Sequence, residues 1–178
     1  MTAEKHARVF FALWPQPQLQ AVLGALAEHL QTQCGGRATP AEKTHVTLFF
    51  VGSIGPEGLA ALESSAGEVS GGGSFDLELD TLGYWKHNRI AWVGASRCPE
   101  ALLTLEADLR QRLVAQGFSA EDRPYVPHVT MVRNASRAPQ ARRISPLEWR
   151  VPDFALVESV PTGSGGVRYD VMRRWPLA

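Results

Sequence analysis

A four-residue motif that occurs twice places the strongest constraint on how this chain can fold. His-Val-Thr-Leu, which begins at His45, recurs as His-Val-Thr-Met beginning at His128, and each copy lies within an apolar segment typical of a β-strand. Because side chains alternate between the two faces of a strand, His45 shares a face with Thr47, and His128 shares a face with Thr130. Two such strands brought together would line a cleft with two imidazoles and two hydroxyls.

The remaining segments indicate a mixture of strands and helices in a chain of 178 residues, which is about one domain long. Apolar residues recur at helical spacing in three segments that begin near a proline and end near a glycine. The strands and helices do not follow the strict βαβ alternation of a parallel sheet, which favours the α+β class. We expect strands at residues 8–14, 44–51, 75–79, 89–95, 126–133, 154–160 and 167–173, and helices at residues 15–35, 56–69 and 99–117.

The charge balance and the cysteines exclude several classes of function. Lys+Arg and Asp+Glu number 18 each, so any contact with nucleic acid must come from a local basic patch rather than from overall charge. No apolar run approaches the roughly 20 residues of a membrane span, and no secretory signal is recognisable at the N-terminus. Cys34 and Cys98 lack C-x-x-C spacing and cannot form a zinc site. We therefore expect two reduced thiols in a cytoplasmic protein with no membrane association.

Two imidazoles and two hydroxyls suit phosphoryl chemistry. Imidazole titrates near neutral pH, so one histidine can accept a proton from water while the other donates a proton to the leaving oxygen. A threonine hydroxyl can donate to a non-bridging phosphate oxygen, where negative charge must be stabilised. The chain has no carboxylate cluster for magnesium, no glycine-rich phosphate loop and no serine elbow. The motifs therefore predict a reaction without metal or cofactor, in which water attacks a phosphodiester.

The two motifs and their flanks resemble the bacterial and archaeal RNA 2′,3′-cyclic phosphodiesterases, also called 2′-5′ RNA ligases, within the two-histidine phosphoesterase superfamily. The resemblance runs nearly from end to end. It includes Arg-Val-Phe-Phe-Ala-Leu from Arg8, Phe-Val-Gly after the first motif, Arg-Pro-Tyr-Val-Pro before the second, and Trp-Pro-Leu from Trp175. Met131 and Val132 replace a commoner leucine and alanine of the family, and neither touches the functional atoms of the motif.

The resemblance implies both a fold and an activity. The fold is a single bilobal domain over residues 1–178, in which two pseudo-symmetric lobes, each a small antiparallel sheet with outer helices, surround a central cleft. The reaction opens a terminal 2′,3′-cyclic phosphate of RNA to a 2′-phosphomonoester. By analogy with the family, His45 is the proton donor and His128 the proton acceptor. Thr47, Thr130 and Arg133 bind the substrate phosphate. Independently of the resemblance, nothing in the sequence indicates an obligate interface, and we expect a monomer.

Several other residues have two interpretations that the sequence leaves open. Arg133 lies five positions after His128, so strand alternation places it on the opposite face unless the strand ends or bulges there. Phe49 shares the face of His45 and either stacks on a nucleobase or belongs to the core. Tyr84 and Trp85 either contact an RNA end or lie exposed at a hairpin tip. The best candidate for an RNA-backbone patch is a basic stretch in a loop, formed by Arg137, Arg142 and Arg143.

Three alternatives to cyclic-phosphate hydrolysis on RNA remain open from the sequence. The same site could join a cyclic-phosphate end to a 5′-hydroxyl end through a 2′-5′ linkage. A non-catalytic module that binds RNA ends would keep the cleft but has no need of two imidazoles so placed. A small cyclic nucleotide could replace RNA as the substrate, which the neutral net charge permits.

Overall fold

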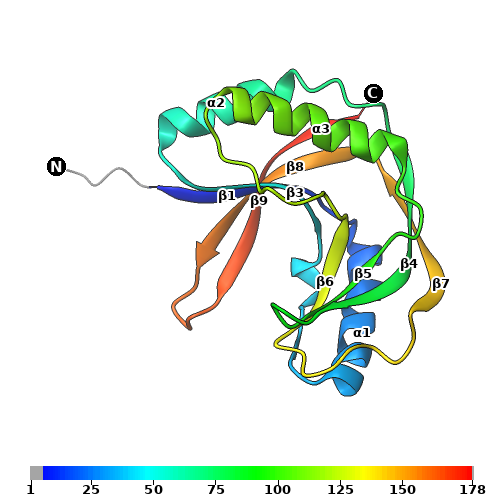
Figure 1. Ribbon diagram of the computed structural model, residues 1–178. Coiled ribbons are helices and arrows are strands. Elements are labelled where there is room, and N and C mark those ends of the chain that lie inside the picture. The colour runs from blue at the N-terminus through cyan, green and yellow to red at the C-terminus, as the bar shows by residue number, and fades with distance from the viewer. Residues whose placement is uncertain (1–5, 178) are drawn as a thin grey trace.

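The computed structural model describes residues 6–177, which form three α-helices and one antiparallel sheet (Figure 1). The helices are α1 (Pro17–Cys34), α2 (Pro56–Gly67) and α3 (Glu100–Ala115), and a 3₁₀ turn, η1, covers Ala41–Lys43. The strands are β1 (Ala7–Leu13), β2 (Arg37–Ala38), β3 (Val46–Ile54), β4 (Phe75–Trp85), β5 (Ile90–Gly94), β6 (His128–Arg133), β7 (Arg143–Val151), β8 (Asp153–Pro161) and β9 (Val167–Pro176). Helices combined with a purely antiparallel sheet confirm the predicted α+β class.

The sheet consists of two similar halves that meet at its centre. The strand order is β7–β4–β5–β6–β3–β1–β8–β9, and β2 also pairs with β6. Reading outward from the centre, β6, β5, β4 and β7 in one half correspond to β3, β1, β8 and β9 in the other. Between the central strands β3 and β6, the pairing consists of the single bridge between Val46 and Val129. The two predicted lobes are thus the halves of one sheet.

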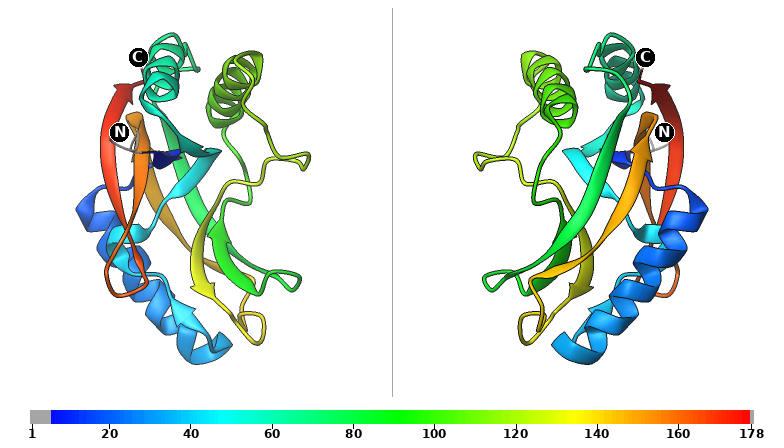
Figure 2. Two further views of the ribbon diagram at one scale, coloured as in Figure 1. Left: turned by 90° about the vertical axis from the view of Figure 1, so that its left-hand side faces the viewer. Right: turned by 90° about the vertical axis from the view of Figure 1, so that its right-hand side faces the viewer.

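Each half of the sheet is covered by a helix from the other half of the repeat. The helix α1 follows β1 in the chain, yet it contacts β6 and β2. The helix α3 follows β5, yet it contacts β3, and α2 packs beside α3. Figures 1 and 2 show α2 and α3 together at one end of the molecule and α1 at the other. The two halves are therefore interlocked through their helices.

The helices form where their apolar residues line up on one face. In α3 that face consists of Leu102, Leu105, Leu109 and Leu113, all with no exposed surface. In α1 proline occupies the first turn, where its missing N–H has no intrahelical partner to lose. The helix α1 ends at Cys34 and is capped by Gly35, whose φ of 69° is easily adopted only by glycine, and whose N–H donates to the Gln31 carbonyl oxygen.

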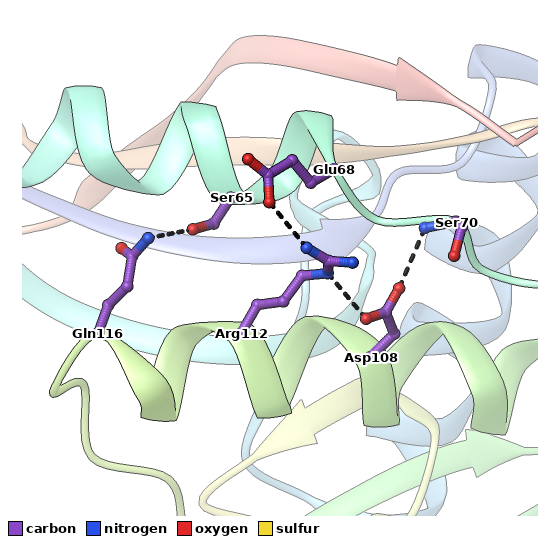
Figure 3. Close-up of polar contacts among 6 residues, drawn as sticks. All are labelled: Ser65, Glu68, Ser70, Asp108, Arg112 and Gln116. Atoms are coloured by element: carbon purple, nitrogen blue, oxygen red, sulfur yellow. Dashed lines mark hydrogen bonds and ion pairs between the residues drawn. The ribbon is translucent and has the colours of Figure 1, made fainter.

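A polar network fastens α2 to α3, as Figure 3 shows. The Arg112 guanidinium lies 2.8 Å from the Asp108 carboxylate on its own helix and 2.9 Å from the Glu68 carboxylate at the end of α2. One turn further along, the Gln116 side-chain amide donates to the Ser65 hydroxyl. Arg112 therefore links two carboxylates, one on each side of the helix pair, while the leucine face of α3 remains free to pack on the sheet.

Two strands, β2 and β7, do not appear among the predicted elements, and β4 continues to Trp85, beyond its predicted end. The sequence of β7 alternates apolar and polar residues only after Pro146, so its first half has the pattern of a loop. Trp149 and Val151 are buried and give β7 its core face. Among residues 6–177, none of the helices combines the length and apolar character of a membrane span.

Candidate active site

The four motif residues lie on one face at the centre of the sheet. Val46 and Val129 form the bridge between β3 and β6, and both have no exposed surface. Their neighbours in the chain are half-buried and face away from the core. Continuing the antiparallel register by one residue in each direction sets His45 opposite Thr130 and Thr47 opposite His128. The pairing therefore gives each imidazole a hydroxyl on the neighbouring strand. The structure brings these four predicted residues together.

Both imidazoles are oriented by the same local hydrogen bond. Nδ1 of His45 lies 2.8 Å from the carbonyl oxygen of Lys43, and Nδ1 of His128 lies 2.8 Å from the carbonyl oxygen of Val126. Because a carbonyl oxygen can only accept, each Nδ1 carries a proton and donates it. Nε2 is therefore the nitrogen that gains or loses a proton, and each ring can act as a base or an acid through this atom.

Burial keeps both imidazoles neutral at pH 7. It lowers the pKa of His45 to about 4, the hydrogen bond to the Lys43 carbonyl opposes this shift in part, and the positive charge of Arg133 adds to it. The pKa of His128 is also lowered, chiefly by burial, and the Arg123 and Arg133 guanidiniums add to the effect. An anion bound between these groups would offset the positive charge of the guanidiniums and favour the protonated rings.

Aromatic rings surround His45. The Trp14 ring stacks on the imidazole at 5.4 Å with an interplanar angle of 14°, and the Phe10 ring lies at 4.9 Å. The Tyr169 ring approaches edge-on at 5.5 Å. Sequence reasoning did not assign Trp14 to the site, although it follows Phe10 at an even spacing on the same strand face. The shared parity of these two residues is the signal that could have found it.

His128 has its own aromatic neighbours, Trp85 and Trp92. The Trp85 ring lies edge-on at 4.4 Å and the Trp92 ring at 6.3 Å. Trp85 is half-buried against His128, so it is not the exposed hairpin-tip residue that was one of its two sequence interpretations. Tyr84 donates its hydroxyl proton to the Ala135 carbonyl oxygen at 3.0 Å, which ties the β4 end to the segment after β6.

A β-bulge returns Arg133 to the face of the histidines. The register between β5 and β6 shifts after Thr130, and the extra residue is Met131. Met131 and Val132 are both fully buried, although they are consecutive. The alternation therefore restarts, and Arg133 lies on the same side as His128. Its charge lowers the pKa of both imidazoles, which agrees with this placement.

A similar β-bulge in β3 places Phe49 in the core and Phe50 on the face of His45. The register between β1 and β3 shifts between Phe49 and Thr47, and Leu48 and Phe49 are both buried. Phe49 is a core residue with 6% of its surface exposed, which decides between its two sequence interpretations. Phe50 instead lies on the His45 face, 45% exposed, with the Arg8 guanidinium 5.1 Å from its ring centre. Sequence reasoning missed Phe50 because the bulge is not visible in the pattern.

A cavity of about 430 Å³ opens beside His45. Its lining includes Thr130 and Arg133 from β6, together with the segment from β2 to η1 and the turn between β8 and β9. The full set is Arg37, Ala38, Thr39, Pro40, Lys43, His45, Thr130, Arg133, Gly165, Gly166, Val167 and Tyr169. Within residues 6–177, no three His, Cys, Asp or Glu side chains cluster in a way that could hold a metal ion. The cavity lining is basic and includes no carboxylate side chain from the described residues.

Two of the three arginines of the predicted basic patch, Arg137 and Arg143, make contacts within the protein. The Arg143 guanidinium lies 2.9 Å from the Asp80 carboxylate, and Arg137 donates through Nε to the Gln33 carbonyl oxygen at the end of α1. Arg142 is exposed.

The loop that leads into the second motif is tied to the first motif. The Tyr125 hydroxyl in this loop donates at 3.2 Å to the carbonyl oxygen of Thr47. The two motifs are therefore connected by this hydrogen bond as well as by the bridge between their central valines.

Comparison with known proteins gives consistent matches. The family model of the 2′-5′ RNA ligase superfamily matches residues 15–161. The RNA 2′,3′-cyclic phosphodiesterase of Escherichia coli K12 is 33% identical over 175 residues, which cover 96% of each chain. The enzyme of the same name from Thermus thermophilus is 28% identical over 184 residues, covering 96% of this chain and 90% of the relative. The crystal structure of Escherichia coli LigT complexed with 3′-AMP superposes with a TM-score of 0.89 at 29% identity, covering 97% of this chain and 99% of that one.

Proposed function

Because this chain belongs to the 2′-5′ RNA ligase superfamily, we propose that its two histidines open the terminal 2′,3′-cyclic phosphate of RNA by general acid and base catalysis. The activity is RNA 2′,3′-cyclic phosphodiester hydrolysis, for which its relatives are named. One observation carries the mechanism: the Val46–Val129 register sets each imidazole opposite a threonine hydroxyl on the neighbouring strand.

The reaction needs two proton transfers, and the site has one imidazole for each. Nε2 of His128 accepts a proton from water, and the water oxygen forms a bond to phosphorus. The bond from phosphorus to the 3′ oxygen breaks, and that oxygen takes a proton from Nε2 of His45. The products are a 2′-phosphomonoester and a free 3′-hydroxyl. The hydrogen bond that orients His128 is more exposed than that of His45, which supports His128 as the group that water reaches.

Substrate binding favours protonation of His45 by solvent, which gives the ring the proton that it must donate. The free protein holds His45 neutral because the ring is buried beside positive charge. A phosphodiester anion in the site offsets the charge of Arg133 and favours the imidazolium form of His45. The threonine hydroxyls of both motifs donate to the non-bridging oxygens, where Arg133 also faces the developing charge. The bound substrate anion therefore increases the fraction of His45 that is in the imidazolium form and can act as the acid.

The terminal nucleoside has an aromatic contact available on the same face. Phe50 is exposed, and Arg8 lies over its ring, so that a base can stack on the pair. Stacking on an aromatic side chain contributes about 1–3 kcal/mol per base and tolerates any base. We propose Phe50 as the base contact in place of Phe49, which belongs to the core.

The mechanism is tested with a short RNA that ends in a 2′,3′-cyclic phosphate, incubated in EDTA. The wild type should yield the 2′-phosphate, and His45→Ala and His128→Ala should each reduce the rate by about 10²–10⁴-fold. His29→Ala, at an exposed position on α1, is the matched control and should retain full activity. If both site variants kept the wild-type rate, the histidine mechanism would be wrong. Activity abolished by EDTA would contradict metal-independent catalysis.

Ligation shares the site but needs a 5′-hydroxyl end in place of water. Adding an RNA with a 5′-hydroxyl end to the same assay separates the two products by length. We propose hydrolysis as the main outcome, because water is present in far higher concentration than any RNA end. We also propose a single-domain monomer that acts in the cytoplasm, and the two free thiols, Cys34 and Cys98, support that location.

A further inference from the structure

The cavity beside His45 extends beyond the groups that one phosphate needs. His45, Thr130 and Arg133, the groups assigned above to the phosphate that reacts, form part of its lining. The lining also includes Arg37 and Lys43, from the segment between α1 and β3, and the turn between β8 and β9. Two cations thus remain in the cavity after Arg133 is assigned to the phosphate that reacts.

The arginines of this cavity form a like-charged pair. Arg37 on β2 and Arg133 on β6 are direct cross-strand partners, so their Cα atoms are separated by roughly 5 Å. Like charges in this arrangement destabilise a sheet. Within residues 6–177, no carboxylate forms an ion pair with Arg37, Lys43 or Arg133. The arginines that are ion-paired elsewhere are Arg110, Arg112, Arg123, Arg143, Arg150, Arg168, Arg173 and Arg174. Three cations without a carboxylate partner among the described residues therefore line this one cavity.

An unsatisfied hydroxyl gives independent evidence for a ligand at the same place. Thr39 lines the cavity, and its side-chain oxygen is buried with no hydrogen-bond partner among the residues that the structure describes. Its backbone is held in place, because the Thr39 N–H donates at 2.8 Å to the Met131 carbonyl oxygen. A buried hydroxyl without a partner is unfavourable and rare in folded proteins. A ligand oxygen in the cavity would accept its proton.

We propose that Arg37, Lys43 and Thr39 bind a second phosphate of the substrate, the phosphodiester on the 5′ side of the terminal nucleotide. The proposal rests on the proposed function, since it places the cyclic phosphate between the histidines. One oxygen of this phosphodiester accepts a hydrogen bond from the Thr39 hydroxyl. The negative charge of the diester offsets the positive charges of Arg37 and Lys43, and this reduces the repulsion between Arg37 and Arg133. The site therefore distinguishes an oligonucleotide end from a cyclic mononucleotide, although both carry the same reactive ring.

Three substrates with the same terminal base test the subsite. The first is a nucleoside 2′,3′-cyclic phosphate, the second is the same compound with a 5′-phosphate, and the third is a dinucleotide that ends in the cyclic phosphate. The wild type should show at least about tenfold higher kcat/KM for the dinucleotide than for the mononucleoside compound, which corresponds to about 1.4 kcal/mol. In the Arg37→Gln/Lys43→Gln variant this ratio should fall to near one. Arg97→Gln, at an exposed arginine outside the cavity, should keep the wild-type ratio.

Salt dependence gives a second measure of the same contact. Each contact to a phosphate of a single strand contributes about −0.7 to the slope of the logarithm of the binding constant against the logarithm of the salt concentration. The wild type should therefore respond more steeply to salt with the dinucleotide than with the mononucleoside compound, and the double variant should lose this difference. Melting temperatures of the variants, measured without substrate, check that the fold is intact.

The outcomes separate the two proposals. If the wild type opens none of the three substrates, the proposed function fails. If it opens all three with equal kcat/KM, or if the double variant keeps the dinucleotide preference, the second phosphate site is refuted while the function stands. If the 5′-phosphate raises kcat/KM of the mononucleoside compound to the value of the dinucleotide, the subsite is supported and also accepts a phosphomonoester. Stimulation by the dinucleotide alone, lost in the double variant, supports it as a diester site.

Discussion

Acidification should destabilise this protein through one buried imidazole. His45 has a pKa of about 4 in the folded chain and about 6.5 when unfolded. Between these values the unfolded chain binds a proton that the folded chain does not, so the free energy of unfolding falls as pH decreases. The contribution of His45 is fully present above pH 6.5 and is lost as pH falls toward 4. The cause is the closely packed ring environment formed by Phe10, Trp14 and Tyr169.

The magnitude follows from the pKa difference. Each pKa unit corresponds to about 1.4 kcal/mol, so the loss from His45 alone is about 2 kcal/mol at pH 5 relative to pH 8. Other groups titrate over the same range, among them His128, whose pKa is also lowered. The contribution of His45 is therefore measured as the difference between the wild type and His45→Gln, which keeps a donor for the Lys43 carbonyl but cannot titrate.

Urea unfolding at pH 8, 6.5 and 5 measures the effect. The His45→Gln variant should lose about 2 kcal/mol less than the wild type between pH 8 and pH 5. The matched control, His29→Gln, replaces an exposed histidine and should follow the wild-type pH dependence. Inorganic phosphate, as an anion that favours the charged ring, should reduce the acid sensitivity of the wild type only. A parallel pH dependence in wild type and His45→Gln would refute the argument from burial.

Four further variants test the placement of residues in and beside the site. Phe49→Ala should destabilise the fold by about 3–5 kcal/mol in urea unfolding, whereas Phe50→Ala should change stability by less than about 1 kcal/mol and raise KM for a cyclic-phosphate RNA. Tyr125→Phe should cost about 1 kcal/mol of stability and lower kcat, because the hydrogen bond to the Thr47 carbonyl is lost; unchanged values of both would remove Tyr125 from the support of the first motif. Arg133→Met should raise the histidine pKa values in NMR titrations and lower kcat/KM, and unaltered titrations would show that the guanidinium does not face the rings.

Sequence patterns were sufficient for the elements whose apolar period is regular. The leucines of α3 and the apolar stretch of β1 are buried as their spacing predicts. The α+β class followed from the order of such elements. The motif repeat also placed four polar residues correctly with respect to their strand faces, because no irregularity separates the histidine from the threonine in either copy.

The sequence could not show where the alternation breaks. Met131 and Val132 are both apolar, as are Leu48 and Phe49, so nothing in their identity reveals which residue of each pair bulges. The face of every later residue in the strand depends on that choice. For this reason the face of Arg133 stayed open. The pairing of Arg37 with Arg133 was equally hidden, since a two-residue strand has no recognisable pattern.

The exchange of helices between the halves of the sheet limits how this chain can be divided. The strands β4 to β7 follow one another in the chain, yet they rely on α1, which precedes them, and they carry α3, which covers β3. Deleting residues 75–151 would remove α3 from the remaining half and leave only α2 in contact with β3, and the excised piece would lack α1. Two fragments cut in the loop before α3 should each be unstructured alone and regain a shared fold only when mixed. A split-protein reporter built at that loop would therefore register reassembly of the entire catalytic face rather than the docking of two preformed parts.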